Sequence, residues 1–263
     1  MHIEVDNVSF SYGPSTGMVI KDICMDIDRP GLYCIIGPNG VGKSTLIKCL
    51  NKINKPTSGT VKIDGRDIEG IPNKDVAKMV SYVPVAGEDM FSMPVVDAVL
   101  IGRFTHQKWK TTVDDLKKVY RTLKLLGISS LSMRGFNELS AGQHQKVAIA
   151  RALVQETPIM LLDEPTANLD VRYQVYIAEL LKELAIAKDM IIIMISHDLN
   201  IASRFSDKVI MMEEPGVIRQ IGAPEDVINK ETIEEVYGVS CEIFFDGRGK
   251  PQVMLGSALR IDE

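Results

Sequence analysis

The sequence predicts an α/β fold with an antiparallel β layer near its N-terminus and an inserted α-helical subdomain. Three observations lead to this prediction. After residue 158, strand-like and helix-like segments alternate, which is typical of a parallel sheet. Before about residue 65 the segments read mostly as strands separated by glycine and proline, and residues 94–156 read mostly as helices.

The N-terminal part contains four strand candidates and one helix. The run LYCIIG (32–37) is short, apolar and ends in glycine, the pattern of a buried strand that leads directly into a loop. Residues 43–52 follow with a helical pattern. The other three strand candidates alternate loosely between apolar and polar residues, at 3–10, 19–27 and 60–65.

The middle of the chain predicts helices at 94–103, 114–127 and 141–155. In the second of these, apolar residues recur with the helical period, and Gly127 is a favourable stop. Those apolar residues are Leu116, Val119, Leu123 and Leu126. The C-terminal part then predicts strands at 159–164 and 190–196, helices at 170–187 and 198–205, and a hairpin at 208–222.

We interpret the whole chain, 1–263, as one domain in several parts. An α/β nucleotide-binding core comprises 1–86 and 158–240, a helical subdomain comprises 87–157, and a β extension comprises 241–263.

Composition narrows the functional classes. The net charge of −5 argues against a dedicated nucleic-acid binder, which needs a basic face. Four cysteines (Cys24, Cys34, Cys49, Cys241) lack metal-binding spacing, so we expect packed free thiols in a reducing compartment. The N-terminus has no signal-peptide pattern, and the longest apolar run, 190–195, is too short to span a bilayer.

The stretch GPNGVGKST (37–45) matches the phosphate-loop pattern G-x-x-x-x-G-K-[ST] between a predicted strand and a predicted helix. Backbone amides and the helix N-terminus of such a loop supply positive potential to phosphate oxygens. We therefore expect a P-loop NTPase (RecA-like) core that binds a nucleotide and Mg²⁺. An ordinary glycine-rich turn is the weaker alternative. The expected nucleotide ligands here are Gly37, Pro38, Asn39, Gly40, Gly42, Lys43, Ser44 and Thr45, with Lys43 on the β- and γ-phosphates and Ser44 on the metal.

Two carboxylates end the predicted strand at 159–164. Asp163 is expected beside the Mg²⁺ at the carboxyl edge of the sheet. Glu164 follows it and is expected to accept a proton from the attacking water. A solvated acidic turn would be the better interpretation of these two residues if no phosphate loop were present.

His197 ends the next predicted strand, so it is expected at the same edge as Asp163 and Glu164. A neutral imidazole there could donate a hydrogen bond to a γ-phosphate oxygen. A structural or solvated histidine remains the alternative.

The stretch LSAGQ (139–143) looks like a second phosphate-binding helix entrance, about a hundred residues after the phosphate loop. Taken in order, the phosphate loop, LSAGQ, Asp163–Glu164, NLD (168–170) and His197 resemble the ATP-binding subunit of an ABC transporter. In that family the LSAGQ-like signature motif serves the nucleotide of a second, head-to-tail subunit. The resemblance therefore implies that Ser140, Gly142 and Gln143 face ATP on a partner copy, with Ala141 in place of a glycine. This replacement is mild if the position needs no positive φ. A simple helix N-cap at Ser140 is also expected.

The resemblance assigns further positions one at a time. Tyr12 is expected to stack on adenine, the alternative being a strand residue packed in the core. Leu169 and Asp170 resemble the loop that crosses between subunits and reaches the second site. At Val85 the family usually has a glutamine, and valine can neither ligate a metal nor hold a water; Glu88 or an extra water on Mg²⁺ could compensate.

The segments 88–104 and 233–253 resemble the importer branch that serves iron–siderophore, haem and vitamin B12 permeases. This implies an ATPase, active as a homodimer that sandwiches two ATP, at the cytoplasmic face of a prokaryotic cell membrane. It docks a permease near Val85–Met93 and acts indirectly with an extracytoplasmic substrate-binding protein. Met90, Phe91 and Met93 either line the docking groove or belong to the core of the insertion.

The main alternative is a soluble cassette ATPase of iron–sulfur assembly or nucleic-acid work. An exporter and a P-loop kinase are weaker alternatives. The kinase leaves LSAGQ, NLD and His197 unexplained.

Overall fold

Two β-sheets form the core of the chain, for which the computed structural model describes residues 1–13, 15–85, 93–105 and 111–259. The first sheet is antiparallel, with strand order β2-β1-β4-β5. The second has the order β10-β9-β3-β8-β7-β6; β9, β3, β8, β7 and β6 run parallel, and β10 is antiparallel at one edge. The strands are β1 (Ile3–Phe10), β2 (Ile20–Ile27), β3 (Gly31–Ile36), β4 (Ser58–Ile63), β5 (Arg66–Asp67), β6 (Val80–Val83), β7 (Ile159–Leu162), β8 (Ile191–Ile195), β9 (Lys208–Glu213) and β10 (Val217–Gly222).

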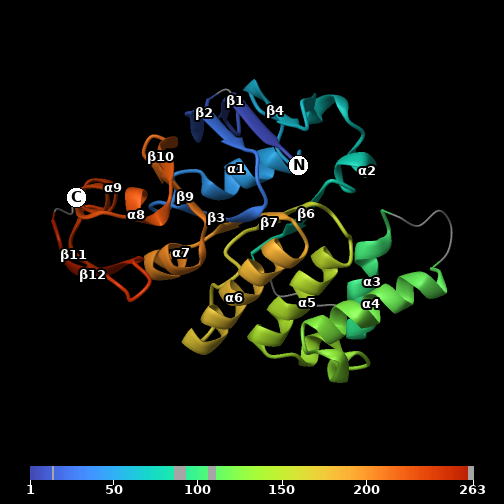
Figure 1. Cartoon of the computed structure of the whole chain (residues 1–263). Coiled ribbons are helices and arrows are strands. Elements are labelled where there is room, and N and C mark those ends of the chain that lie inside the picture. Colours follow the sequence, from blue (N-terminus) through green and yellow to red (C-terminus); the bar gives the residue numbers. More distant parts are fainter. Residues whose placement is uncertain (14, 86–92, 106–110, 260–263) are drawn as a thin grey trace.

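Helices connect the parallel strands, and a group of them is inserted between β6 and β7 (Figure 1). A separate hairpin, β11 (Val239–Phe245) and β12 (Pro251–Ala258), lies at the opposite end of the molecule from this insertion. The order of elements confirms the predicted α/β class with an antiparallel layer and helical content. The helices are α1 (Lys43–Leu50), η1 (Ile68–Gly70), α2 (Asn73–Val76), α3 (Val95–Leu100), η2 (Ile101–Arg103), α4 (Val113–Leu125), η3 (Ser129–Leu131), η4 (Phe136–Glu138), α5 (Ala141–Leu153), α6 (Val171–Ala187), α7 (Leu199–Phe205), α8 (Pro224–Val227) and α9 (Lys230–Tyr237).

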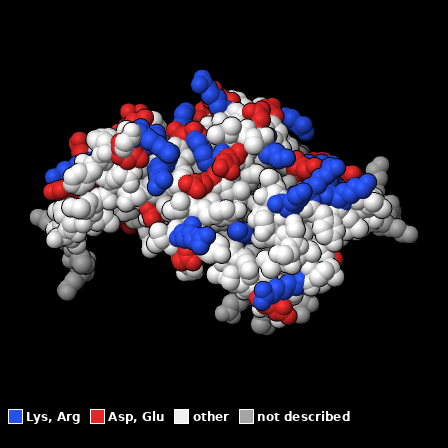
Figure 2. Space-filling view, turned by 60° about the horizontal axis from the view of Figure 1, so that its bottom comes forward, with Lys and Arg blue, Asp and Glu red and all other residues white. Residues whose placement is uncertain are grey.

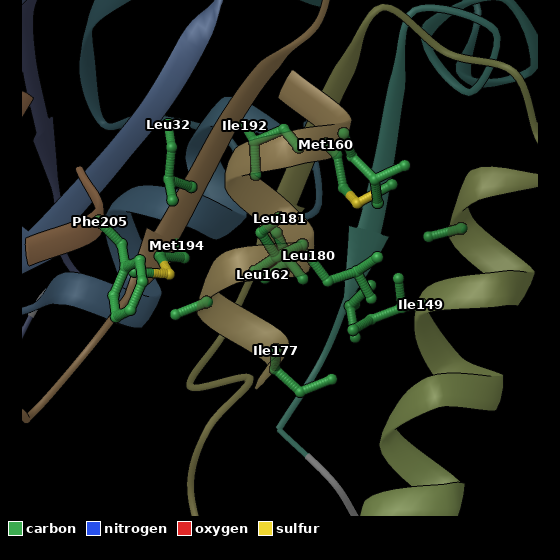
Figure 3. Packing of buried hydrophobic residues seen from close by; sticks show 14 of the residues in the cluster. Leu32, Ile149, Met160, Leu162, Ile177, Leu180, Leu181, Ile192, Met194 and Phe205 are labelled. Carbon is green, nitrogen blue, oxygen red and sulfur yellow. The ribbon is translucent and has the colours of Figure 1, made fainter. Parts of the chain in front are cut away.

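The six-stranded sheet is buried on both faces, and alternation along its strands divides the interior into two cores. On β7, Met160 and Leu162 join the core that contains residues of α5 and α6, part of which Figure 3 shows. Ile159 and Leu161 join the other core, between the sheet, α1 and the antiparallel layer. The helices α1 and α5 therefore pack on opposite faces of the sheet.

The insertion is fastened by a buried ion pair as well as by apolar contacts. Arg103 Nε lies 3.0 Å from Asp115 Oδ1, and both side chains are at most 8% exposed. The Nη1 of Arg103 donates to the Val154 carbonyl and to Glu156. Asp115 thus lies on the buried side of α4, whereas Leu116, one of the apolar residues that follow the helical period, is 38% exposed. The buried face of α4 runs through Asp115, Val119 and Leu123, and Leu116 lies beside this face.

The cysteine prediction also needs one correction, because Cys24 is exposed, whereas Cys34, Cys49 and Cys241 are buried; all four are free. Cys24 lies on β2 at a position whose side chain points to solvent, which follows from the alternation of that strand. None of the helices in the described ranges is both long and apolar enough to cross a lipid bilayer.

Candidate active site

The phosphate loop leaves β3 at Gly37 and enters α1 after Gly42, as the motif predicts. A Cβ on Gly42 would meet the Val19 carbonyl oxygen at 2.7 Å, and its φ of 91° disfavours other residues. At Gly40, whose φ is 86°, an added Cβ would meet no atom within 4 Å, so the outer side of the loop is open there. The loop is crowded toward the protein and bare on its outer side, which leaves its backbone accessible to phosphate oxygens.

The Lys43 side chain is folded into this loop. Its Nζ donates to the carbonyl oxygens of Gly37 at 2.8 Å and Pro38 at 2.6 Å, and the residue is 6% exposed. Burial lowers the pKa of the Lys43 amine, while Glu164 and Asp163 act in the opposite direction. A cation is therefore held at the centre of the loop, beside the two strand-end carboxylates. Asn39 is exposed on the loop's surface.

Ser44 and Asp163 meet across the loop, as expected from the sequence. Ser44 Oγ donates to Asp163 Oδ1 at 2.8 Å, and Asp163 is 3% exposed. A hydroxyl and a carboxylate oxygen at this distance suit Mg²⁺, a cation that prefers oxygen ligands. The described residues include no cluster of three or more His, Cys, Asp or Glu side chains able to hold a metal. The pair thus fits the usual Mg²⁺ mode, in which one or two carboxylates act together with substrate phosphates.

Glu164 and His197 lie together at the same edge of the sheet. His197 Nε2 is 2.6 Å from Glu164 Oε1, and the side chains are 42% and 25% exposed, respectively. Glu164 has a φ of 50°, an uncommon left-handed conformation for this residue type. Both residues line a cavity of about 550 Å³, which Val253 and Leu255 of the C-terminal hairpin also line. The left-handed backbone of Glu164 is a form of strain that is frequent at functional sites.

Tyr12 lies beside the start of α1. Its hydroxyl is 3.2 Å from Thr45 Oγ1, and its ring contacts Phe10 edge-to-face at 4.9 Å between centroids. Because Tyr12 is 63% exposed, the alternative of a core-packed residue is wrong. An exposed aromatic ring next to the phosphate loop has the placement that a base-stacking residue needs.

The signature segment (Leu139–Gln143) lies on the other face of the sheet, at the N-terminus of α5. Ser140 and Gln143 cap each other: Ser140 Oγ accepts from the Gln143 amide, and Gln143 Oε1 accepts from the Ser140 amide. Ala141 lies in the first helical turn and has no positive φ, so replacing glycine there causes no backbone strain. Among the described residues, no hydrogen bond joins Ser140 or Gln143 to the phosphate loop of the same chain.

Gly142 and Asp170 connect the signature segment to the loop after Glu164. A Cβ on Gly142 would lie 2.9 Å from the Tyr173 ring, so glycine lets α5 pack closely on α6. Asp170 caps α6 by accepting a hydrogen bond from the Tyr173 amide at 3.0 Å. The Asp170 loop and the signature helix are thus joined through Tyr173.

The permease-docking prediction concerns the segment from Val85 to Met93. Val85 is 42% exposed and follows β6 by two residues. Met93 is half-buried and packs against the larger core, which favours the core interpretation for this residue. Glu88, Met90 and Phe91 lie outside the described residues.

Sequence reasoning missed Tyr82, which lies beside the Ser44–Asp163 pair that suits Mg²⁺. The Tyr82 hydroxyl donates to Asp163 Oδ2 at 3.4 Å. Burial, together with the neighbouring Asp163, raises the pKa of Tyr82 to about 12. The missing signal was strand register, because only the pairing of β6 with β7 shows that Tyr82 and Asp163 share a face.

Comparisons with known proteins agree with this geometry. Residues 20–167 match the family described as ABC transporter. The chain is 44% identical over 254 residues to an uncharacterized ABC transporter ATP-binding protein of Methanocaldococcus jannaschii, covering 97% of this chain and 98% of that protein. It is 35% identical to the ferric enterobactin transport ATP-binding protein FepC of Escherichia coli, covering 92% and 89%, respectively.

Solved structures show the same likeness. A putative metal-chelate type ABC transporter in an inward-facing conformation matches with a TM-score of 0.84 and 25% identity, covering 96% of each chain. A dimeric ATP-binding cassette bound to ADP and Pi matches with a TM-score of 0.72 and 27% identity, covering 84% of this chain and 98% of that one.

Proposed function

This chain belongs to the ABC transporter family and is one of its ATPase subunits, and we propose that it powers the uptake of a metal chelate through a membrane permease. The observation that carries the proposal is the assembly of Lys43, Ser44–Asp163 and Glu164–His197 at one sheet edge. Iron–siderophore, haem or cobalamin is the substrate class we propose. This choice is supported by the ferric enterobactin transport protein and by the metal-chelate type transporter among the similar proteins.

Each side chain has a defined task in ATP hydrolysis. Lys43 and the loop amides bind the β- and γ-phosphates, and Tyr12 stacks on the base. Ser44 and Asp163 would hold Mg²⁺, which supplies positive charge to the phosphate oxygens. Glu164 orients the attacking water and accepts its proton. His197 pairs with the Glu164 carboxylate and is placed to donate to the γ-phosphate of bound ATP.

The signature segment completes the site of a second copy. Ser140 is exposed at the N-terminus of α5, where the helix dipole favours an anion, yet it lies on the opposite face of the sheet from α1. A head-to-tail homodimer that sandwiches two ATP brings Ser140, Gly142 and Gln143 to the partner's phosphate, with Asp170 in the loop between the sites. The dimeric cassette among the structural relatives supports a dimeric assembly.

The same proposal places the chain at the cytoplasmic face of a prokaryotic membrane, docked to permease subunits near Val85–Met93. An extracytoplasmic substrate-binding protein acts with the complex indirectly. On the face shown in Figure 2, acidic and basic side chains are interspersed with uncharged surface. The net charge of −5 leads us to expect no nucleic-acid partner. The alternative of a soluble cassette ATPase has no support among the similar proteins.

Mixing two inactive variants tests the shared site. Lys43→Ala removes the cation of the phosphate loop, and Ser140→Arg blocks the exposed helix end with a bulky side chain. Each variant alone forms only defective sites in a homodimer. A mixed dimer contains one site with an intact loop from one copy and an intact signature from the other, so ATP hydrolysis should return on mixing.

The matched control carries both substitutions in one chain and is mixed with an equal amount of the Lys43→Ala chain. No dimer in that mixture contains an intact loop, so no activity should return. If the two single variants stay inactive after mixing, although light scattering shows dimers with ATP, the head-to-tail arrangement is wrong.

A further inference from the structure

We propose that Tyr82 is a positioning residue for the Mg²⁺ site: its hydroxyl fixes the second carboxylate oxygen of Asp163. The inference rests on the proposed function, because it assumes that Mg²⁺–ATP binds beside Ser44 and Asp163. Tyr82 contacts neither the phosphate loop nor Glu164 through any hydrogen bond among the described residues. Its effect on the reaction would therefore pass through Asp163.

Strand register brings the two side chains together. β6 and β7 are parallel, with Tyr82 opposite Leu161 and Val83 opposite Leu162. The Asp163 amide donates to the Val83 carbonyl at 2.9 Å and continues this pairing past the end of β7. Because side chains alternate along a strand, Leu161 and Asp163 point to one face, and Tyr82 points to the same face. That face carries α1 and the phosphate loop, since Leu161 packs in the core that contains α1 residues.

The hydroxyl groups of Ser44 and Tyr82 bind different oxygens of the Asp163 carboxylate. Ser44 Oγ donates to Oδ1 at 2.8 Å, and the Tyr82 hydroxyl donates to Oδ2 at 3.4 Å. Asp163 is 3% exposed, so water has little access to either oxygen. A carboxylate held at one oxygen can still turn about its terminal bond, whereas donors at both oxygens fix its plane.

Tyr82 is the side chain of β6 that can supply this second bond. Of the other β6 residues, Val80 and Val83 are apolar, and the Ser81 hydroxyl donates to the Ile159 carbonyl at the far end of the strand pair. Val85 follows the end of β6 by two residues and stands where a glutamine was expected. Its side chain has no polar atom that could bind Asp163. Orientation of Asp163 from the β6 side thus depends on the phenol hydroxyl.

Partners that orient a metal ligand typically contribute 10–100-fold to metal affinity. The test compares ATP affinity with and without Mg²⁺, measured by fluorescence of a labelled ATP analogue in a Glu164→Gln background, in which turnover is expected to be slow. In the parent, Mg²⁺ should strengthen nucleotide binding. In Tyr82→Phe this strengthening should fall about tenfold, while affinity in EDTA stays unchanged.

Tyr33→Phe is the matched control. Tyr33 lies on β3 in the same core, and its hydroxyl donates to the Arg29 carbonyl at 2.9 Å, away from the loop. Its removal should leave the Mg²⁺ effect intact. Asp163→Asn changes the proposed metal ligand itself and should remove the Mg²⁺-dependent gain in ATP affinity. It therefore sets the largest loss that Tyr82→Phe could produce.

Two outcomes would overturn the role of Tyr82: a Tyr82→Phe protein with the full Mg²⁺ effect, or one whose affinities with Mg²⁺ and in EDTA fall by the same factor. The second outcome would mark a merely structural residue. A parent protein that binds no ATP, or binds it without any influence of Mg²⁺, would overturn the proposed function first, and this is visible before any Tyr82 variant is made.

Discussion

Two regions of the molecule differ in where their site residues find hydrogen-bond partners. These regions are the carboxyl edge of the six-stranded sheet and the N-terminus of α5. At the sheet edge, Lys43, Asp163, Glu164 and His197 each have a hydrogen-bond partner in the site. At the start of α5, Ser140 bonds to Gln143 three residues away in its own helix. One region is thus assembled by tertiary structure, whereas the other is a capped helix end displayed on the surface.

The two regions are also anchored differently. The sheet edge rests on strands paired in register and packed between two apolar cores. The insertion that carries α5 depends in addition on the buried pair of Arg103 and Asp115. Because the anchors are separate, we expect that substitutions can damage one region and spare the other.

The largest expected effect concerns the sheet edge. Glu164→Gln removes the proposed proton acceptor but keeps a side chain of the same size, so turnover should fall by roughly 10²–10⁴-fold. ATP affinity should persist, because Lys43 and the loop remain intact. Steady-state ATPase rates and nucleotide titrations check both parts. A variant that keeps a substantial fraction of its turnover would remove Glu164 from the mechanism.

The next effect concerns the anchoring of the insertion. Arg103→Met leaves the buried Asp115 carboxylate without its cation, which typically costs about 3–5 kcal/mol in the free energy of unfolding. Urea unfolding monitored by circular dichroism measures this. Arg219→Met, which removes a cation from ion pairs that are largely exposed, is the control and should cost at most about 1 kcal/mol. Equal losses for the two variants would contradict the special role of the buried pair.

Acid should weaken the same anchor. Burial favours a higher pKa for Asp115, but hydrogen bonds from Thr112 and Arg103 outweigh it and lower the pKa to about 2, from an ordinary value of 3.8. A depressed pKa in the folded state means that the stabilisation is complete well above pH 3.8 and is lost as the pH falls toward 2. The stability gap between the parent and Arg103→Met should therefore narrow as the pH falls from about 4 toward 2.

The smallest effect concerns the helix end. Ser140→Ala removes the N-cap of α5 and should cost about 1 kcal/mol of stability. Asn229→Ala removes a similar capping box from α9 and serves as the control. Both should lose comparable stability in thermal unfolding, but only Ser140→Ala should also lower ATP hydrolysis. If the two variants hydrolyse ATP alike, Ser140 is only a cap.

Much of this site could be predicted from local sequence, because its parts are short motifs attached to recognisable strands and helices. The phosphate loop needs glycine at Gly42, and the strand ends at Asp163 and His197 follow from apolar runs that stop at polar residues. Leu116 and Tyr82 show where local reasoning fails. The period of apolar residues does not show that Asp115, next to Leu116, is buried in a pair with Arg103, and the placement of Tyr82 depends on which strand lies beside β6.

The sequence by itself therefore determined the α/β class, the phosphate loop and the carboxylates that serve it, since these depend on periodicity and on residues close together in the chain. Only the tertiary structure decided which polar groups meet. The contact between Ser44 and Asp163 joins residues 119 positions apart, and that between Tyr82 and Asp163 joins residues 81 apart. The reason is that strand order and register are set by the packing of the whole sheet. A local sequence pattern does not indicate which strands pair with each other.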